Sequence, residues 1–228
     1  MAEIKTIVIT GGSDGLGKAL AEKLAKNYQV IILARNEQAL REIATKTSCD
    51  YAVCDVRDAK QVSKAFAEII QKHDRIDVLI NNAGVIVNGE LVDTSDEDIE
   101  NVITTNTLGG IYVAKAALKH MKKQRSGLIV NVVSQAGLIA RATRSLYNAS
   151  KWALTGFTKA LQQETAEYGV RVTGFYPGTI KTDLFAKAGI EMKGPAITTE
   201  QAVKSIEFLL SCDGDVLIPE LGIKHLEG

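Results

Sequence analysis

The chain has 228 residues, of which 46% are hydrophobic and 24% are charged, a balance that is ordinary for a globular protein and excludes fibrous and disordered classes. Basic and acidic residues both number 27, so the net charge is zero and the basic surface of a nucleic-acid-binding protein is not expected. The apolar runs are too short to cross a membrane and the first residues do not resemble a signal peptide, so we expect a cytoplasmic protein that binds neither membranes nor nucleic acid.

Strand-sized apolar runs alternate with longer runs of helical period along the whole chain. The predicted strands are 4–10, 29–34, 50–55, 76–81, 127–134, 170–178 and 215–218. The predicted helical segments are 15–27, 36–46, 58–72, 95–123, 145–163 and 199–210. Because the strands are apolar on both faces and helices separate them, the pattern predicts one α/β domain over 1–228. We expect a Rossmann-like, doubly wound parallel sheet of about seven strands with helices on both faces.

Two local features modify this pattern. The segment 182–198 has weak periodicity and lies where such sheets open at the carboxyl ends of their strands, so we expect it to form a mobile flap over the substrate. Pro219 cannot donate a hydrogen bond to a neighbouring strand, so the last strand is expected to stop or to become an edge there.

Cysteines and histidines do not point to a disulfide framework or a metal. The three cysteines, Cys49, Cys54 and Cys212, form no CxxC pair, and an odd number favours a reducing compartment. The three histidines lie among polar neighbours with no second ligand at helical or turn spacing. We therefore expect no metal site.

A glycine-rich turn, TGGSDGLG, joins the first strand to the first helix. Glycines at Gly11, Gly15 and Gly17 would let the backbone approach a pyrophosphate, whose charge would face the free N–H groups at the start of the helix. The spacing is not the GxGxxG fingerprint, and an ordinary strand-to-helix turn is the other interpretation. Its place in the first βα unit favours a dinucleotide site.

The end of the second strand indicates which dinucleotide is preferred. Proteins that bind NAD usually carry an acidic residue there for the ribose hydroxyls, whereas this chain has Ala34 and Arg35. A guanidinium can hold a 2′-phosphate by charge-assisted bonds, so NADP(H) is favoured and NAD(H) is less favoured, with Ser13 and Asn36 assisting. The other interpretation is that Arg35 is a solvated residue at the start of a helix.

A phenol and an ammonium lie four residues apart in YNASK. Tyr147 and Lys151 would share one face of a helix, and a positive charge near a phenol favours phenolate and acid–base work closer to neutral pH. Ser134, near the end of the fifth strand, can hydrogen-bond a substrate oxygen and hold it against the phenol.

Taken in order, these motifs resemble the short-chain dehydrogenase/reductase family over nearly the whole chain. TGGSDGLG is similar to the family's TGxxxGxG turn, NNAG at 81–84 to its structural motif, and PGTIKT at 177–182 to the segment beside the nicotinamide. Asp55 stands where the family has the acid that contacts adenine, and Asn106 where it has the catalytic asparagine. The residues that match the catalytic set are Asn106, Ser134, Tyr147 and Lys151.

The resemblance implies a role for each member of this set. Tyr147 would exchange a proton with the substrate oxygen that Ser134 orients, and Lys151 would bind the nicotinamide ribose and favour phenolate. Asn106 would hold a water in a proton relay, although it could instead tie a helix to a strand. The expected substrate-side residues are Ser134, Tyr147, Gln135, Leu184 and Phe185. The expected cofactor-binding residues are Gly11, Ser13, Asp14, Gly15, Leu16, Gly17, Arg35, Asn36, Asp55, Val56, Asn82, Ala83, Gly84, Tyr147, Lys151, Pro177, Gly178, Ile180 and Thr182.

The function implied is an NADP-dependent oxidoreductase that transfers a hydride between nicotinamide and a small carbonyl or secondary alcohol substrate. A non-catalytic NADP-binding regulator on the same fold is the alternative. The family resemblance also implies a homo-oligomer, a dimer or a tetramer. Arg141 and Arg144 lie between Ser134 and Tyr147, where one of them could meet an anionic substrate group or remain a solvated loop charge.

Overall fold

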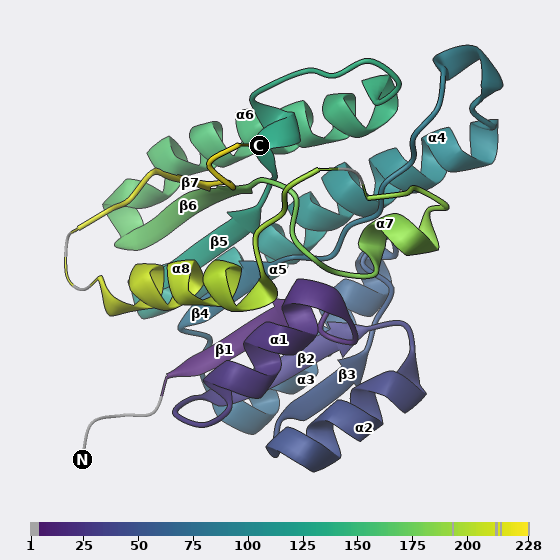
Figure 1. Ribbon diagram of the computed structural model, residues 1–228. Helices are drawn as coiled ribbons and strands as arrows, with labels where there is room; N and C mark the ends of the chain where they lie inside the picture. Colours follow the sequence, from purple (N-terminus) through teal and green to yellow (C-terminus); the bar gives the residue numbers. More distant parts are fainter. Residues whose placement is uncertain (1–4, 193, 213, 215, 228) are drawn as a thin grey trace.

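A parallel sheet runs through the centre of the computed structural model, which describes residues 5–192, 194–212, 214 and 216–227 (Figure 1). Within these residues seven strands are hydrogen-bonded in the order β3-β2-β1-β4-β5-β6-β7, and every pair is parallel. The strands are β1 (Thr6–Thr10), β2 (Gln29–Ala34), β3 (Asp50–Val53), β4 (Val78–Asn81), β5 (Gly127–Val132), β6 (Val170–Pro177) and β7 (Glu220–Ile223). The predicted fold class is confirmed.

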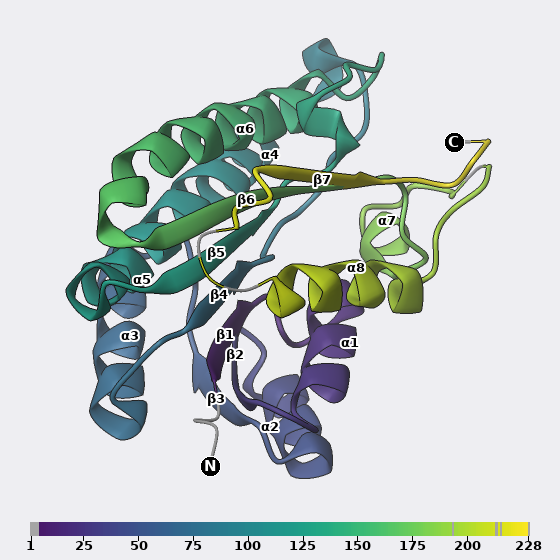
Figure 2. The same ribbon diagram turned by 90° about the vertical axis from the view of Figure 1, so that its left-hand side faces the viewer.

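Helices cover both faces of the sheet (Figure 2). One face carries α1 (Gly15–Leu24), α2 (Glu37–Thr47) and α8 (Thr199–Ser211), and the other carries α3 (Ala59–His73), α4 (Asp96–Ile103), α5 (Gly110–Gln124) and α6 (Ser145–Thr165). Short helical turns lie at η1 (Leu91–Asp93), η2 (Thr104–Gly109), η3 (Gln135–Gly137), η4 (Ala166–Tyr168) and α7 (Leu184–Lys187). None of the helices among the described residues has the length and apolar character needed to span a bilayer.

The alternation of side chains in β1 explains why both faces are covered. Ile7 and Ile9 belong to the apolar cluster that contains residues of α1 and α8, whereas Val8 belongs to the cluster that contains residues of α3 and α5. All three side chains are fully buried. Because successive strand residues point to opposite faces, an apolar strand of this kind is stable only between two helical layers.

The chain reverses direction across the sheet between β1 and β4. From β1 it runs outward through β2 to β3, and it then returns to β4 on the other side of β1. The loops that leave β1 and β4 therefore diverge at the carboxyl ends of these strands, which is where doubly wound sheets bind ligands. They remain tied together, because Thr10 Oγ1 accepts hydrogen bonds from the backbone N–H groups of Asn82 and Ala83, both at 3.0 Å.

The prediction for the last strand was wrong. Asp215 lies outside the described residues, and 216–218 are not a strand. Instead β7 begins directly after Pro219 and pairs with β6, from Gly174 opposite Glu220 to Pro177 opposite Ile223. Pro219 lacks a donor, but its carbonyl accepts from the N–H of Gly174 at 3.0 Å, so the proline leads into the edge strand rather than ending it.

Two other boundaries differ from the sequence prediction. The strand β5 ends at Val132, two residues before Ser134. The long helix expected over 95–123 is divided by η2, a π-helical segment that separates α4 from α5. An extra residue in a turn of this kind changes the direction of the side chains that it carries, and such segments are frequent at functional sites.

Candidate active site

A cavity of about 1190 Å³ opens at the carboxyl ends of the strands and gathers almost all of the predicted site residues. Its lining includes the glycine turn, the ends of β2 and β3, the loops that follow β4, β5 and β6, and the first turns of α6. The predicted residues that line it are Gly11, Ser13, Asp14, Gly15, Leu16, Arg35, Asn36, Asp55, Val56, Asn82, Ala83, Gly84, Ser134, Gln135, Tyr147, Lys151, Pro177, Gly178, Ile180, Thr182, Leu184 and Phe185. Gly17 and Asn106 are buried and are not among the residues that line it.

Two glycines of the turn, Gly11 and Gly17, lie so close to neighbouring atoms that a side chain would not fit. A Cβ on Gly17 would lie 2.2 Å from the carbonyl oxygen of Gly11, and a Cβ on Gly11, whose φ is +66°, would lie 3.0 Å from Cα of Ala83. Side chains at these positions would push the turn away from the loop after β4. The turn, together with the cavity in front of it, therefore fits a bound pyrophosphate, and the N–H groups at the start of α1 lie behind it.

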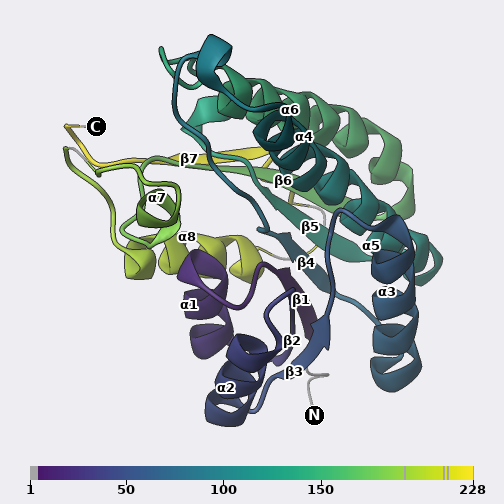
Figure 3. The ribbon, with the colours of Figure 1, turned by 90° about the vertical axis from the view of Figure 1, so that its right-hand side faces the viewer.

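Asp14 joins the glycine turn to the segment predicted as a flap. It caps α1 by accepting from the N–H of Gly15 at 2.7 Å, and it forms an ion pair with Lys187 of α7. Partial burial would raise the pKa of Asp14, but the hydrogen bonds from Lys187 and Gly15 and the lysine charge hold it below its ordinary value. Figure 3 shows α7 at the same end of the molecule as the start of α1. Residue 193 of this segment lies outside the described residues.

Arg57 holds Asp55, which follows β3 and lines the cavity. Its Nη2 donates to Asp55 Oδ2 at 2.7 Å, and its Nε lies 3.1 Å and 3.0 Å from the two carboxylate oxygens. Partial burial raises the pKa of Asp55, but this hydrogen-bonded guanidinium outweighs the effect and lowers it. The sequence prediction missed Arg57, although its position two residues after the predicted acid could have indicated it.

The two residues expected to bind the 2′-phosphate line the same cavity as Asp55. Arg35 is exposed and lines the cavity. Asn36 is the N-cap of α2, where its Oδ1 accepts from the N–H of Ala39 at 3.1 Å. The cap fixes the start of α2 and leaves the side-chain amide NH₂ group of Asn36 available.

Tyr147 lies in the first turn of α6, is buried, and lines the cavity together with Ser134. Burial raises the pKa of Tyr147, and Ser134 and the charge of Arg144 only partly oppose this effect. This direction is opposite to the one expected from the sequence, because removal from water disfavours phenolate more strongly than the surrounding groups favour it.

Lys151 follows Tyr147 by one helical turn. Its Nζ lies 5.8 Å from the centroid of the Tyr147 ring and donates to the carbonyl oxygen of Val132 at 3.1 Å. Burial lowers the pKa of Lys151 to about 8, so a large share of these side chains would be neutral at slightly alkaline pH. Gly84 leaves space in front of the lysine, since a Cβ at this position would come within 3.6 Å of Nζ.

Ser134 has an unusual backbone conformation for a serine, with φ at +121°. Its Oγ accepts from the N–H of Ala136 at 3.2 Å, which fixes the hydroxyl oxygen and leaves its proton available. Strained backbone of this kind costs stability and is concentrated at sites of function.

Asn106 lies within η2, and its side chain is already bonded at both ends. Its Oδ1 accepts from the N–H of Val85 at 2.8 Å, and its Nδ2 donates to the Val85 carbonyl at 2.9 Å and to Ser150 Oγ at 3.0 Å. The asparagine thus ties the loop after β4 to α6, which agrees with the structural role weighed against the relay.

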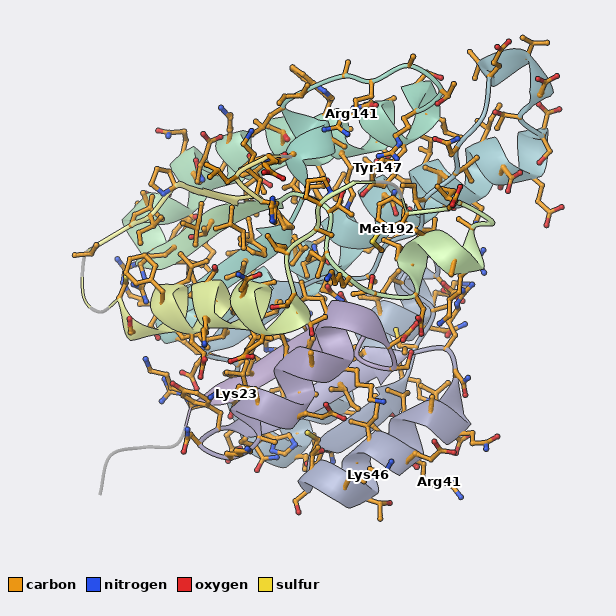
Figure 4. All side chains as sticks on the ribbon, in the orientation of Figure 1. Lys23, Arg41, Lys46, Arg141, Tyr147 and Met192 are labelled. Carbon is orange, nitrogen blue, oxygen red and sulfur yellow. The ribbon has the colours of Figure 1, made fainter. Side chains whose placement is uncertain are left out.

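Asn148 is a second residue that the sequence prediction missed. Its Nδ2 donates to the carbonyls of Ala136 and Ile139 at 2.7 Å and 2.8 Å, so it holds the segment after Ser134 against α6. Figure 4 labels Arg141 of this segment and Tyr147 in the same part of the molecule, and both line the cavity.

Three comparisons place the chain among known proteins. A family model described as short chain dehydrogenase matches residues 5–193. The chain is 35% identical to carbonyl reductase family member 4 of Xenopus laevis over 97% of this chain and 99% of that protein. It is 39% identical to a 3-oxoacyl-[acyl-carrier-protein] reductase of Bos taurus over 79% of this chain and 77% of that protein. A solved structure described as ElxO with NADP bound superimposes with a TM-score of 0.89 at 33% identity, covering 97% of both chains.

Proposed function

Because this chain belongs to the short-chain dehydrogenase family, we propose that it is an NADP-dependent oxidoreductase that interconverts a carbonyl compound and its secondary alcohol. One observation carries the proposal: Tyr147 and Ser134 line the same cavity as the glycine turn, and the Nζ of Lys151 lies 5.8 Å from the centre of the buried Tyr147 ring. Carbonyl reduction requires a proton donor and a binding site for the nucleotide cofactor in the same cavity.

In this proposal Tyr147 and Ser134 act on the substrate oxygen. The serine hydroxyl polarises and orients a carbonyl oxygen, and Tyr147 donates its proton to that oxygen as negative charge develops. The high pKa of a buried tyrosine suits an acid that must remain protonated until the substrate is in place.

Lys151 and the glycine turn would hold the cofactor, which supplies the hydride when bound. Lys151 Nζ faces the space in front of Gly84, where a ribose hydroxyl could accept from it. An anionic cofactor nearby would also favour the charged lysine and so oppose the effect of burial on its pKa. Asn106 positions this region by fixing Val85 and Ser150.

The preference for NADP over NAD rests on Arg35 and Asn36. Both line the cavity at the end of β2, where no carboxylate stands to bind the ribose hydroxyls or repel a 2′-phosphate. The structural neighbour with NADP bound is consistent with this preference.

A homo-oligomer, dimer or tetramer, also belongs to the proposal. Trp152 of α6 is 51% exposed and Leu108 of η2 is 37% exposed, so these two helical segments present apolar surface to solvent. A second copy of the chain could cover it. The cytoplasmic location expected from the sequence stays a prediction.

The test is to measure consumption of NADPH and NADH, side by side, with a broad panel of ketones and aldehydes, using Tyr147→Phe as the control. We expect turnover with NADPH that the variant loses while it keeps NADPH affinity, because only the proton is removed. Tight NADPH binding with no turnover of any compound would favour the regulator; activity retained by Tyr147→Phe would refute the role of the tyrosine.

A further inference from the structure

Resting on the proposed function, we propose that the substrate carries an anionic group, a carboxylate or a phosphate, that is bound by Arg144 with Arg141 beside it. Both arginines belong to the segment that connects η3 to α6, and both line the cavity together with Gln135, Leu184 and Phe185. They lie at the substrate end of the cavity, on the same side as Tyr147.

Most of the arginines are already bound to carboxylates or to backbone carbonyls, but in the described part of the chain three that line the cavity are not. Of the eight arginines, three bind carboxylates in ion pairs, namely Arg41, Arg57 and Arg75. Arg125 and Arg171 donate to backbone carbonyls. Among the described residues, Arg35, Arg141 and Arg144 have neither kind of partner, and all three line the cavity. Arg35 lies where a 2′-phosphate would bind, which leaves two guanidinium groups for the substrate.

The second step is the absence of a competing carboxylate at that end. The described acidic residues that line the cavity are Asp14, Asp55 and Asp98. Asp14 is paired with Lys187, Asp55 is paired with Arg57, and Asp98 accepts from Ser95 at the start of α4. None of the three forms an ion pair with Arg141 or Arg144, so an anionic ligand would meet unneutralised positive charge.

The third step is that Arg144 is already oriented. Its Nε donates to Asn88 Oδ1 at 3.3 Å, and its guanidinium lies 5.6 Å from the centroid of the Phe185 ring. Within the described residues no other hydrogen bond is made by its side chain, so both terminal NH₂ groups are free to bind a ligand. A guanidinium held at Nε and over a ring can present its terminal donors as a fork to two oxygen atoms.

The backbone next to Arg144 is fixed as well. Thr143 has φ at +60°, an unfavourable conformation for a β-branched residue. Its carbonyl accepts from the N–H of Gly89 at 2.8 Å, and its hydroxyl donates to Asn88 at 3.3 Å. Asn148 holds the other end of the segment. The arginine is thus placed by a constrained turn rather than by a free loop.

The charge of Arg144 is also close enough to Tyr147 to lower the pKa of its hydroxyl. An anion on Arg144 would therefore lie near the substrate oxygen that Tyr147 contacts. This proximity favours a short oxo acid or a phosphorylated ketone over a substrate whose anionic group is distant from its carbonyl.

The experiment compares pairs of substrates that differ only in charge. Acetoacetate and levulinate are measured against their methyl esters, and dihydroxyacetone phosphate against dihydroxyacetone, by NADPH consumption. The wild-type protein is compared with Arg144→Gln and Arg141→Gln. Arg41→Gln, which removes one charge from α2 at the opposite end of the molecule, is the matched control (Figure 4). The readout is the ratio of kcat/KM for the anion to that for its neutral partner, because this ratio cancels any effect of Arg144 on Tyr147.

We expect the wild-type protein to prefer at least one anion by about tenfold or more, as charge-assisted hydrogen bonds allow. Arg144→Gln should reduce this ratio about tenfold, mainly through KM, Arg141→Gln should reduce it less, and Arg41→Gln should not change it. The substrate pair that shows the larger preference for the anion indicates whether the site binds a carboxylate or a phosphate. The proposal would be overturned if the neutral substrate were favoured in every pair, or if the ratio of kcat/KM values were the same in Arg144→Gln and in the wild type. Either result would leave the proposed oxidoreductase activity intact.

A second measurement applies if none of these compounds is turned over. Calorimetric titration of succinate and of inorganic phosphate, with NADP⁺ present, measures anion binding without turnover. Weaker binding to Arg144→Gln by about tenfold, with Arg41→Gln unchanged, would support the anion site. Equal binding to all of the variants would overturn it. Failure of the oxidoreductase proposal is separate, since it would appear as no Tyr147-dependent turnover across the wider carbonyl panel.

Discussion

The Lys151 ammonium lies 5.8 Å from the centre of the Tyr147 ring, and both side chains are buried in the first two turns of α6. Burial acts on the two groups in opposite directions, because it raises the pKa of the phenol and lowers the pKa of the ammonium to about 8. Each group is therefore shifted toward its neutral form. The pair is adapted to hold a proton on the tyrosine and to release one from the lysine.

The shift at Lys151 predicts how the stability of the protein depends on pH. Above about pH 8 the folded protein loses the lysine proton, whereas the unfolded chain keeps it until about pH 10.5. The unfolded state then binds more protons, so the free energy of unfolding rises with pH across this window. Relative to Lys151→Met, which lacks the group, the wild-type protein should gain about 3 kcal/mol.

Urea denaturation of both proteins at several pH values between these limits measures this gain. Lys204→Met is the control, because this exposed lysine of α8 pairs with exposed Glu200 and should shift the curve little. A difference between the wild type and Lys151→Met that stays constant with pH would show that the buried lysine keeps its ordinary pKa.

The backbone of Ser134 leads to a prediction about stability and activity together. Ser134→Gly and Ser134→Ala both remove the hydroxyl that is proposed to orient the substrate oxygen, so both should lose most of the activity. They differ in that only glycine adopts φ at +121° without strain. Ser134→Gly should therefore be more stable than Ser134→Ala by about 1 kcal/mol, measured by thermal or urea unfolding. Equal stability of the two variants would contradict the strained conformation.

Much of the fold could be predicted from the sequence because the strands are buried on both faces and the helices are amphipathic. The edge strand β7 could not, since its residues alternate between exposed and half-buried and its place is set by the pairing with β6. The apolar residues chosen instead, Val216 and Leu217, are 58% and 40% exposed. Hydrophobicity identifies central strands better than edge strands.

The candidate site also has features that the sequence predicts and features that it does not. The residues that line the cavity follow from the motif order, whereas the direction of the Tyr147 pKa depends on burial that only the folded chain creates. Two other features depend on backbone geometry that neither composition nor periodicity indicates. They are the hydrogen bond from Arg57 to Asp55 and the position of Asn106 in a π-helical turn. Sequence patterns thus locate the site, and packing determines its electrostatics.

The role proposed for Arg35 predicts a change in cofactor preference. Arg35→Asp replaces a guanidinium that can bind a 2′-phosphate by a carboxylate that repels it and can accept from ribose hydroxyls. The affinity for NADPH should fall about tenfold to a hundredfold, while the affinity for NADH is kept or improved. Fluorescence titration of both nucleotides measures this, with Arg41→Asp as a control for net charge. An unchanged ratio of the two affinities would show that Arg35 does not contact the phosphate.

The ion pair between Lys187 and Asp14 predicts how the segment around α7 behaves. It joins α7 to the glycine turn, and both partners are partly exposed, so its removal should cost no more than about 1 kcal/mol. Lys187→Met should therefore leave global unfolding nearly unchanged but let the segment around α7 open more often. Hydrogen exchange of the amides of Leu184 to Ala188 should accelerate by up to about fivefold. Lys204→Met, which removes an ion pair within α8, should leave these amides unaffected. If exchange around α7 is the same in Lys187→Met and in the wild type, this ion pair does not hold the segment closed.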